Sequence, residues 1–281
     1  MSKYFYGHYF KLQSASDTIA FIPSYAKVGK DYTASLQVIT KDESIVIDFP
    51  YEEYLRGDGF EVKIGNNVFN KEGIELDIDR EDVRIKGNIR FGELAPLEGS
   101  IMGPFNYVPF MECKHVVCSI KHKVSGKIEL NGKELVFEDG SYGYIEGDRG
   151  RSFPSRYIWT HSLFDEGSVM LSVADIPFGL FHFTGIIGFI KYKDILFRIG
   201  TYRFAKVVEL TGNSVTVKQS RYILKVGLLE KNAHPLKAPT KGKMVRIIRE
   251  SLYSKVRYIL LVEGKEIFNQ VSPSASMEFE M

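Results

Sequence analysis

The feature that most constrains this chain is the repetition of short, β-rich runs separated by turn signals, with almost no helical periodicity. Runs rich in Val, Ile, Phe, Tyr and Thr recur along the sequence, for example Tyr4–Gln13, Thr33–Thr40 and Ser44–Phe49. Such runs, bounded by Gly, Asn and Asp, are typical of strands. Aromatic residues make up 13% of the chain, and they favour half-buried sheet surfaces. We therefore predict an all-β protein.

Three short turns predict hairpins. The dipeptides Asn131-Gly132, Gly212-Asn213 and Glu263-Gly264 supply residues that tolerate the positive φ angles of tight turns. The predicted strand pairs are Ser125–Leu130 with Lys133–Phe137, Ala205–Leu210 with Ser214–Gln219, and Leu260–Val262 with Lys265–Phe268.

Two segments have some helical character. Tyr51–Arg56 has room for one helical turn. Met244, Ile248, Leu252 and Val256 recur every four residues, but the β-rich run that follows them favours a strand, which we predict.

Length and charge divide the chain near residue 150. Many short strands with regular turns indicate a sandwich or barrel, and 281 residues suffice for two such domains. Residues 1–150 carry 18 basic and 24 acidic side chains, whereas residues 151–281 carry 19 and 11. We predict one domain over residues 1–150 and a second over residues 151–281. The basic surplus of the second is typical of a solvated barrel exterior, or of a surface for an anionic partner.

Several functional classes leave no trace in the sequence. Cys113 and Cys118 lie five residues apart on one predicted strand, so they point to opposite faces, which argues against an intrachain disulfide. Phosphate-binding, dinucleotide-binding, zinc-protease and serine-hydrolase motifs are missing, and no pattern indicates nucleic acid binding. The start of the chain lacks a signal-peptide pattern, and no run is apolar enough to span a membrane as a helix. We expect a cytoplasmic protein with no metal and no cofactor; the sequence leaves its oligomeric state open.

The most unusual segment, residues 140–162, combines acids, arginines and aromatic rings. Its extended geometry places Glu146 and Asp148 on one face, roughly 7 Å apart. A carboxyl on the inner wall of a barrel has a raised pKa, and a neighbouring carboxylate raises it further. Either residue is therefore a candidate general acid near neutral pH. The alternative is a structural network of acids and arginines.

Other residues of this region are candidate ligand contacts. An aromatic wall, with Trp159 as the best candidate, stabilises a developing cation through its π face. Upstream, Glu112 and His115 could line a pocket, although their i, i+3 spacing on a strand makes them a poor metal pair. The candidate ligand-binding residues are Arg149, Arg151, Arg156, Tyr157, Trp159, His161, Glu112 and His115. Residues 230–243, rich in Pro and Lys, predict a surface loop, with a lid or a peripheral membrane contact as the alternative.

The ordered motifs of residues 101–164 resemble bacterial members of the tocopherol-cyclase-like family. These motifs are GPFNYVPFMECKHVV, SGKIELNGKELVF and GYIEGDRGRSFPSRYIWTHS. The wider group includes carotenoid 1,2-hydratases and lipocalin-like Diels–Alderases. The resemblance implies two consecutive lipocalin-like (calycin-type) antiparallel β-barrels with a pocket in or between them, and a hydrophobic, often isoprenoid, ligand. One departure is that this chain has a single tryptophan, where the cyclases are tryptophan-rich.

The resemblance leaves three functions open. The first is a cofactor-independent cyclase, isomerase or hydratase that protonates an alkene and captures the cation with a hydroxyl group or with water. The second is a lipid or isoprenoid carrier without chemistry. The third is an interaction protein whose barrels are filled by side chains.

Overall fold

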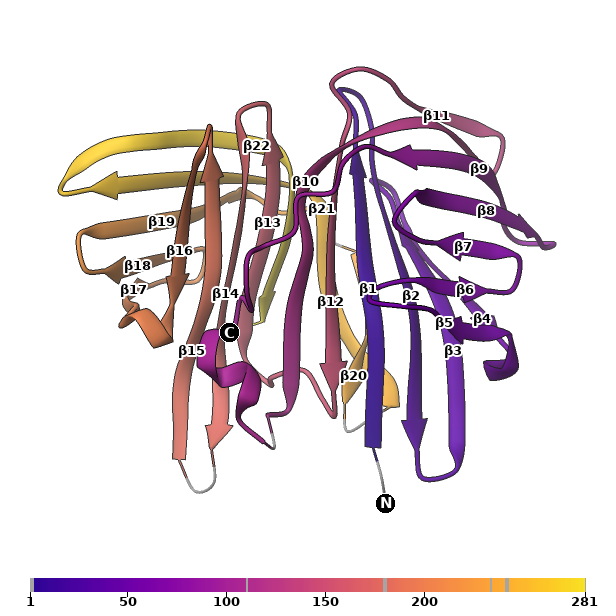
Figure 1. Cartoon of the computed structure of the whole chain (residues 1–281), viewed down its shortest axis with the longest axis horizontal. Coiled ribbons are helices and arrows are strands. Elements are labelled where there is room, and N and C mark those ends of the chain that lie inside the picture. Colours follow the sequence, from indigo (N-terminus) through magenta and orange to yellow (C-terminus); the bar gives the residue numbers. More distant parts are fainter. Residues whose placement is uncertain (1–2, 110, 179–180, 233, 241–242, 281) are drawn as a thin grey trace.

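The protein consists of two curled antiparallel sheets side by side (Figure 1). The computed structural model describes residues 3–109, 111–178, 181–232, 234–240 and 243–280. Helical structure in these residues is limited to three short 3₁₀ segments, η1 (Tyr51–Glu53), η2 (Gly103–Tyr107) and η3 (Thr201–Arg203). The prediction of an all-β chain is confirmed.

The first sheet contains twelve strands in the order β4-β3-β2-β1-β12-β10-β9-β8-β7-β6-β5, with β11 paired to β10. Its strands are β1 (Lys3–Gln13), β2 (Thr18–Val28), β3 (Asp31–Ile39), β4 (Ser44–Phe49), β5 (Tyr54–Arg56), β6 (Val62–Ile64), β7 (Asn67–Phe69), β8 (Gly73–Asp79), β9 (Arg84–Phe91), β10 (Cys113–Leu130), β11 (Lys133–Phe137) and β12 (Tyr142–Gly150).

The second sheet contains ten strands in the order β16-β15-β14-β13-β22-β21-β19-β18-β17, with β20 paired to β21. Its strands are β13 (Tyr157–Phe164), β14 (Gly167–Phe178), β15 (Phe181–Tyr192), β16 (Ile195–Gly200), β17 (Lys206–Leu210), β18 (Ser214–Gln219), β19 (Tyr222–Glu230), β20 (His234–Thr240), β21 (Lys243–Val262) and β22 (Lys265–Glu280). The change of sheet falls between Gly150 and Tyr157, close to the predicted boundary at residue 150; whether each sheet is an independent domain stays a prediction.

The two sheets share one topology. In each, the first four strands pair in sequence, and the last strand returns to pair with the first: β12 with β1, and β22 with β13. The two edge strands of each sheet are consecutive in the chain, β4 with β5 and β16 with β17, and a 3₁₀ segment joins them. Each sheet therefore curls until its edges approach.

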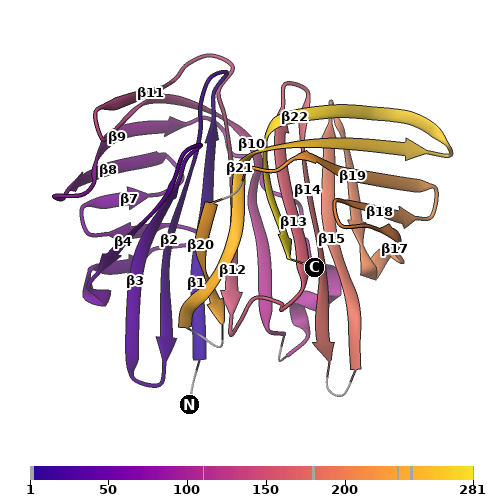
Figure 2. The same cartoon turned by 180° about the vertical axis from the view of Figure 1, so that it is seen from behind.

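Alternation of side chains gives the molecule three hydrophobic layers. Phe10, Phe21 and Phe69 belong to the core inside the first sheet, and Val169, Leu224 and Tyr258 to the core inside the second. A third cluster includes Tyr9, Tyr144, Trp159 and Phe189 and lies where the sheets meet. Figure 2 shows from behind that β1, β12, β20 and β21 lie along this junction. In each central strand, the side chains of one face thus pack in a barrel core and those of the other face pack in the junction.

The predicted hairpins are confirmed, because β10 pairs with β11, β17 with β18 and β21 with β22. Asn131 and Gly132 have φ angles of 50° and 84°, as a tight turn requires. The helical turn expected at Tyr51–Arg56 is present as η1 over its first three residues, whereas Tyr54–Arg56 forms strand β5; the segment from Met244 to Val256 is strand, as predicted.

The loop predicted for residues 230–243 is wrong over its described part. His234–Thr240 forms strand β20, which pairs with β21. Prolines are tolerated there because β20 is an edge strand. Residues 233, 241 and 242 of the predicted loop lie outside the described residues.

Candidate functional site

A cavity of about 180 Å³ lies between the two sheets. For comparison, an engineered lysozyme cavity of about 150 Å³ binds benzene. Most of the residues that line it come from β1, β2, β10 and β12 on one side and from β13, β14, β15 and β22 on the other, and the rest come from β3, β20, β21 and connecting segments. Most of its wall is apolar, with Phe5, Met102, Phe105, Met111 and Phe153 among the contributors. The cavity is therefore suited to a hydrophobic small molecule with few polar contacts.

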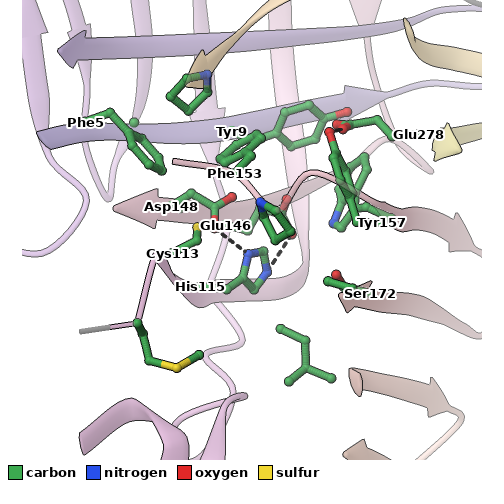
Figure 3. A pocket seen from close by; sticks show the side chains of 18 of the residues that line it. Phe5, Tyr9, Cys113, His115, Glu146, Asp148, Phe153, Tyr157, Ser172 and Glu278 are labelled. Carbon is green, nitrogen blue, oxygen red and sulfur yellow. Dashed lines mark hydrogen bonds and ion pairs between the residues drawn. The ribbon is translucent and has the colours of Figure 1, made fainter. Parts of the chain in front are cut away.

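A polar cluster, with Glu146 buried and His115, Asp148 and Cys113 partly buried, projects into this cavity from β10 and β12 (Figure 3). His115 lies opposite Asp148 in the antiparallel register, so their side chains share a face. The Nδ1 atom of His115 lies 3.0 Å from Oδ1 of Asp148, and its Nε2 atom lies 3.1 Å from Oε2 of Glu146. The Sγ–H of Cys113 donates to the same Asp148 oxygen at 3.2 Å. One imidazole thus bridges two carboxylates.

The charge state of the cluster follows from this geometry. Burial alone would lower the pKa of His115, but Asp148 and Glu146 outweigh it and hold that pKa well above its usual value. His115 is therefore an imidazolium at neutral pH, compensated by the two carboxylates. Burial and the charge of Asp148 raise the pKa of the Cys113 thiol, so this cysteine is a neutral hydrogen-bond donor rather than a nucleophile.

A third carboxyl, Glu278 on β22, faces the cavity from the second sheet. The hydroxyl of Tyr157 donates a short hydrogen bond to its Oε2. Only 7% of Glu278 is exposed. Burial raises its pKa to about 8, although the Tyr157 hydrogen bond works in the opposite direction and the charges of Glu146 and Asp148 add to the rise. Glu278 is therefore a neutral carboxylic acid at pH 7.

The aromatic wall beside Glu278 is formed by Trp159. Trp159 lies opposite Glu278 in the β13–β22 register and opposite Ser172 in the β13–β14 register. Its ring packs edge to face against Tyr9 at a centroid distance of 5.4 Å, which brings a strand of the first sheet against one of the second. The indole is thus held rigidly next to the acid.

The polar cluster rests on a layer of buried groups behind it. The hydroxyl of Tyr144 donates to Oε2 of Glu146 at 2.6 Å, and its ring stacks on His161 at 3.6 Å. Burial, aided by the charge of Lys11, lowers the pKa of His161 well below its usual value. His161 is therefore a neutral packing residue that fixes Tyr144.

The structure brings only some of the predicted site residues together. Glu146, Asp148, His115, Tyr157 and Trp159 line the cavity. The others are not among the lining residues: Glu112, Arg149, Arg151, Arg156 and His161. The three arginines are exposed, and the Glu112 carbonyl oxygen accepts a hydrogen bond from the Arg151 amide at 2.7 Å. A ligand contact by these residues stays a prediction.

One expectation about this region needs correction, and one site residue was not predicted. The inner wall of the first barrel is formed by neighbours such as Ile145, whereas Glu146 faces the space between the sheets. Sequence reasoning also missed Glu278. The alternation of Ser276, Met277 and Glu278 in the last strand places Glu278 on the same face as Ser276. Only the pairing of this strand with β13 brings Glu278 to the cavity.

His115, Glu146 and Asp148 are also the residues with the best geometry for a metal ion. One possible ligand atom of each lies within 4.8 Å of the others. However, both imidazole nitrogens already face a carboxylate, so binding a metal would require the ring to give up one of these contacts. Without a metal ion, the same three residues form an ion-pair cluster in which the imidazole joins two carboxyl groups. Among the described residues, no helix is long and apolar enough to cross a membrane.

The fold is that of known lipocalin-like barrel proteins. No family model matches the sequence, and the curated proteins contain no significant match. Among solved structures, kievitone hydratase from Nectria haematococca aligns with a TM-score of 0.55 and 12% identity over 100% of this chain and 89% of its own.

Two crystal structures of the protein CghA align as well. CghA with Sch210972 gives a TM-score of 0.61 at 9% identity, and CghA alone gives 0.62 at 9%. These alignments cover 99% of this chain in both cases and 89% and 88% of the CghA chains. At such low identity the likeness shows the fold alone, which is two consecutive lipocalin-like antiparallel barrels.

Proposed function

We propose that the cavity between the sheets binds a hydrophobic, alkene-containing small molecule and catalyses its acid-assisted hydration or cyclisation. The observation that carries the proposal is Glu278, a carboxyl that burial keeps protonated on the wall of an apolar cavity. A general acid needs a pKa near the working pH and access to the reacting atom. The name of kievitone hydratase, which shares the fold, indicates that this architecture is compatible with adding water.

The reaction balances without an oxidant or reductant. Glu278 transfers its proton to one alkene carbon, and the π electrons form the new C–H bond and leave a cation on the other carbon. The oxygen of a water molecule then forms a C–O bond to that carbon, and the proton released returns to the Glu278 carboxylate. Capture by a hydroxyl of the substrate itself gives a ring instead of an alcohol.

The residues around Glu278 fit the proton transfer and the cation that this reaction requires. Trp159 lies beside Glu278 and presents an aromatic surface, which stabilises a cation in a water-poor site. The Tyr157 hydroxyl orients the carboxyl of Glu278 through its hydrogen bond. The cavity wall limits competing water, so the position of a bound water or hydroxyl decides between hydration and cyclisation.

The polar cluster of the first sheet supplies hydrogen-bonding groups, whereas Glu278 supplies the proton. Both ring nitrogens of His115 face Asp148 and Glu146, so the imidazole holds these two carboxyl groups in place, and their remaining oxygens can accept a hydrogen bond from the attacking water or from a polar group of the substrate. Glu146 or Asp148 as the proton donor, the assignment favoured by sequence, is the competing proposal. Separate Glu278→Gln, Glu146→Gln and Asp148→Asn variants distinguish these assignments, because only the variant that lacks the true donor loses turnover while it still binds the ligand.

The resemblance to tocopherol-cyclase-like proteins supplies the proposed chemistry and a class of candidate substrates, prenylated phenols. The test begins with native mass spectrometry and organic extraction of the protein from its own host, which identifies a co-purifying ligand. That ligand and a panel of prenylated phenols are then incubated with the protein in heavy-oxygen water. Hydration gives a product that gains one labelled water, whereas cyclisation gives an isomer without label. Consumption of none of these compounds, with intact binding, would contradict catalysis.

A carrier without chemistry is the second candidate function, and the apolar lining of the cavity supports it. It predicts that the extracted ligand is returned unchanged after long incubation, and that Glu278→Gln leaves its affinity unaltered. Failure of the protein to bind any ligand or an apolar dye would favour the third option, an interaction protein.

A further inference from the structure

Several chain segments that surround the cavity come together at one end of the molecule, here called the mouth end. In the first sheet, Phe5 and Cys113 both pair with Gly150, so the start of β1, the start of β10 and the end of β12 coincide. In the second, Tyr157 pairs with Glu280 and Phe178 with Phe181, which places the start of β13, the end of β22, the end of β14 and the start of β15 on one side of that sheet. In Figure 1 the start of β1, the end of β12 and the facing ends of β14 and β15 lie toward the bottom of the molecule, and the end of β22, marked C, lies nearer mid-height.

The cavity reaches this end through apolar side chains. Its lining includes Phe105, Met111, Phe183 and Met244 from segments at the mouth end. In the opposite direction the junction is packed, because the Tyr9 hydroxyl contacts Ser276 Oγ at 2.9 Å and Lys11 Nζ donates to the Ser274 carbonyl at 2.9 Å. A hydrophobic ligand therefore enters at the mouth end.

Two aromatic side chains, Tyr107 and Phe181, are exposed at the mouth end. Phe105 and Phe183 stack at 5.6 Å, and each has an aromatic neighbour two residues away that continues outward. These neighbours are Tyr107 and Phe181, which are 84% and 76% exposed. Large, isolated aromatic rings beside an apolar opening are typical of residues that insert into a membrane interface.

The charge of this end fits an anionic surface. Three exposed arginines, Arg149, Arg151 and Arg156, lie together at this end, and the β2–β3 turn adds Lys30 beside Asp31. The Arg residues lie between β12 and β13, and Lys30 lies in the β2–β3 turn. Cations near a membrane surface are attracted to acidic headgroups, each contributing about a fivefold gain in binding.

We propose that the mouth end docks on an anionic lipid bilayer, with Tyr107 and Phe181 in the interface and the arginines against the headgroups. A hydrophobic substrate then passes from the bilayer to the cavity without crossing water. The inference rests on the proposed function only in that the cavity takes a hydrophobic molecule. It explains why exposed aromatic rings and exposed cations surround the opening.

The experiment measures flotation of the full chain with vesicles that contain no substrate. Phosphatidylcholine vesicles are compared with vesicles that also contain phosphatidylglycerol. We expect binding to the anionic vesicles, a loss of at least about tenfold in the Tyr107→Ser/Phe181→Ser double variant, and a loss of about fivefold per charge in Arg149→Gln and Arg156→Gln. The matched control is Val208→Ser/Leu210→Ser, which removes two exposed apolar residues on edge strand β17 and should bind as the wild type does.

The outcomes separate docking from ligand binding. Uptake of the dye 8-anilinonaphthalene-1-sulfonate from water tests the cavity alone, and the double variant should retain it, which also shows that it is folded. Dye uptake without vesicle binding, or equal binding by the double variant and the control, would overturn the membrane proposal. A dimer that forms through the mouth end and is abolished by Tyr107→Ser/Phe181→Ser, with no vesicle binding, would also overturn it in favour of self-association.

Discussion

The two barrels share the pairing of their first four strands and the return of the last strand to the first, but they contribute opposite chemistry to the cavity between them. The first presents His115 between Asp148 and Glu146, a cluster in which one imidazole faces two carboxyl groups. The second presents Glu278, whose partner is the neutral hydroxyl of Tyr157. Both sets are buried, so burial alone does not decide the protonation state. A buried carboxylate remains charged beside a cation, whereas one beside a neutral donor keeps its proton to a higher pH.

The largest expected effect tests the role of Glu278 in the second barrel. Glu278→Gln keeps the size and the hydrogen bond to Tyr157 but removes the transferable proton, so turnover should fall by about 100- to 10,000-fold. The measurement is the rate with saturating ligand, together with ligand affinity. Glu266→Gln on the exposed part of the same strand is the matched control and should retain full activity. Wild-type turnover by Glu278→Gln would exclude it as the acid.

The next effect concerns the first barrel. His115→Ala leaves two carboxylates without their buried cation, and breaking such a pair typically costs about 3–5 kcal/mol. The free energy of unfolding should therefore fall by at least about 3 kcal/mol in urea denaturation. His182→Ala removes the exposed contact with Asp175, also 3.0 Å long, and should change stability by less than about 1 kcal/mol. Equal effects in both variants would mean that burial of the first pair is irrelevant.

The pH dependence of turnover and stability distinguishes Glu278 from the His115 cluster, because the two titrate for different reasons. Turnover should be constant below pH 8 and fall about tenfold per pH unit above it, as Glu278 loses its proton. Between the unfolded pKa of 4.5 and about 8, the native state retains a proton that the unfolded state has lost. Stability should therefore decline as pH rises through this window, and Glu278→Gln should reduce the decline.

The His115 contribution has its own window. Its folded pKa is raised above 6.5, so the stability that the ion cluster provides is fully present below pH 6.5 and is lost as pH rises through the raised value. In urea denaturation, the free energy of unfolding of His115→Ala should fall less than that of the wild type as pH rises above 6.5. An unchanged profile would show that the imidazole is not charged.

The smallest expected effect concerns the aromatic wall. Trp159→Leu retains a large apolar side chain but removes the π face, and a cation–π contact in a water-poor site is worth about 1–2 kcal/mol. Turnover should fall between about fivefold and thirtyfold, whereas ligand affinity should change less. Phe153→Leu, at another lining aromatic residue, provides the comparison. A larger loss in Phe153→Leu would place the developing charge elsewhere in the cavity.

Local sequence predicted the elements well. Asn131-Gly132 dictated a hairpin because few residue pairs adopt two successive positive φ angles cheaply. The i, i+2 spacing of Glu146 and Asp148 put both on one face because side chains alternate along a strand. The loop predicted at residues 230–243 failed because its prolines and lysines mark an edge strand as readily as a loop.

The sequence by itself thus determined an all-β chain, its hairpins and the pair of acids on β12. Only the tertiary structure decided that these acids face the junction of two barrels rather than a barrel interior, and that Glu278 joins them from the far end of the chain. The reason is physical: alternation assigns a side chain to one of two faces, whereas pairing of β13 with β22 and of β10 with β12 depends on residues far apart in sequence. The pKa of each carboxyl then follows from neighbours that local patterns do not specify.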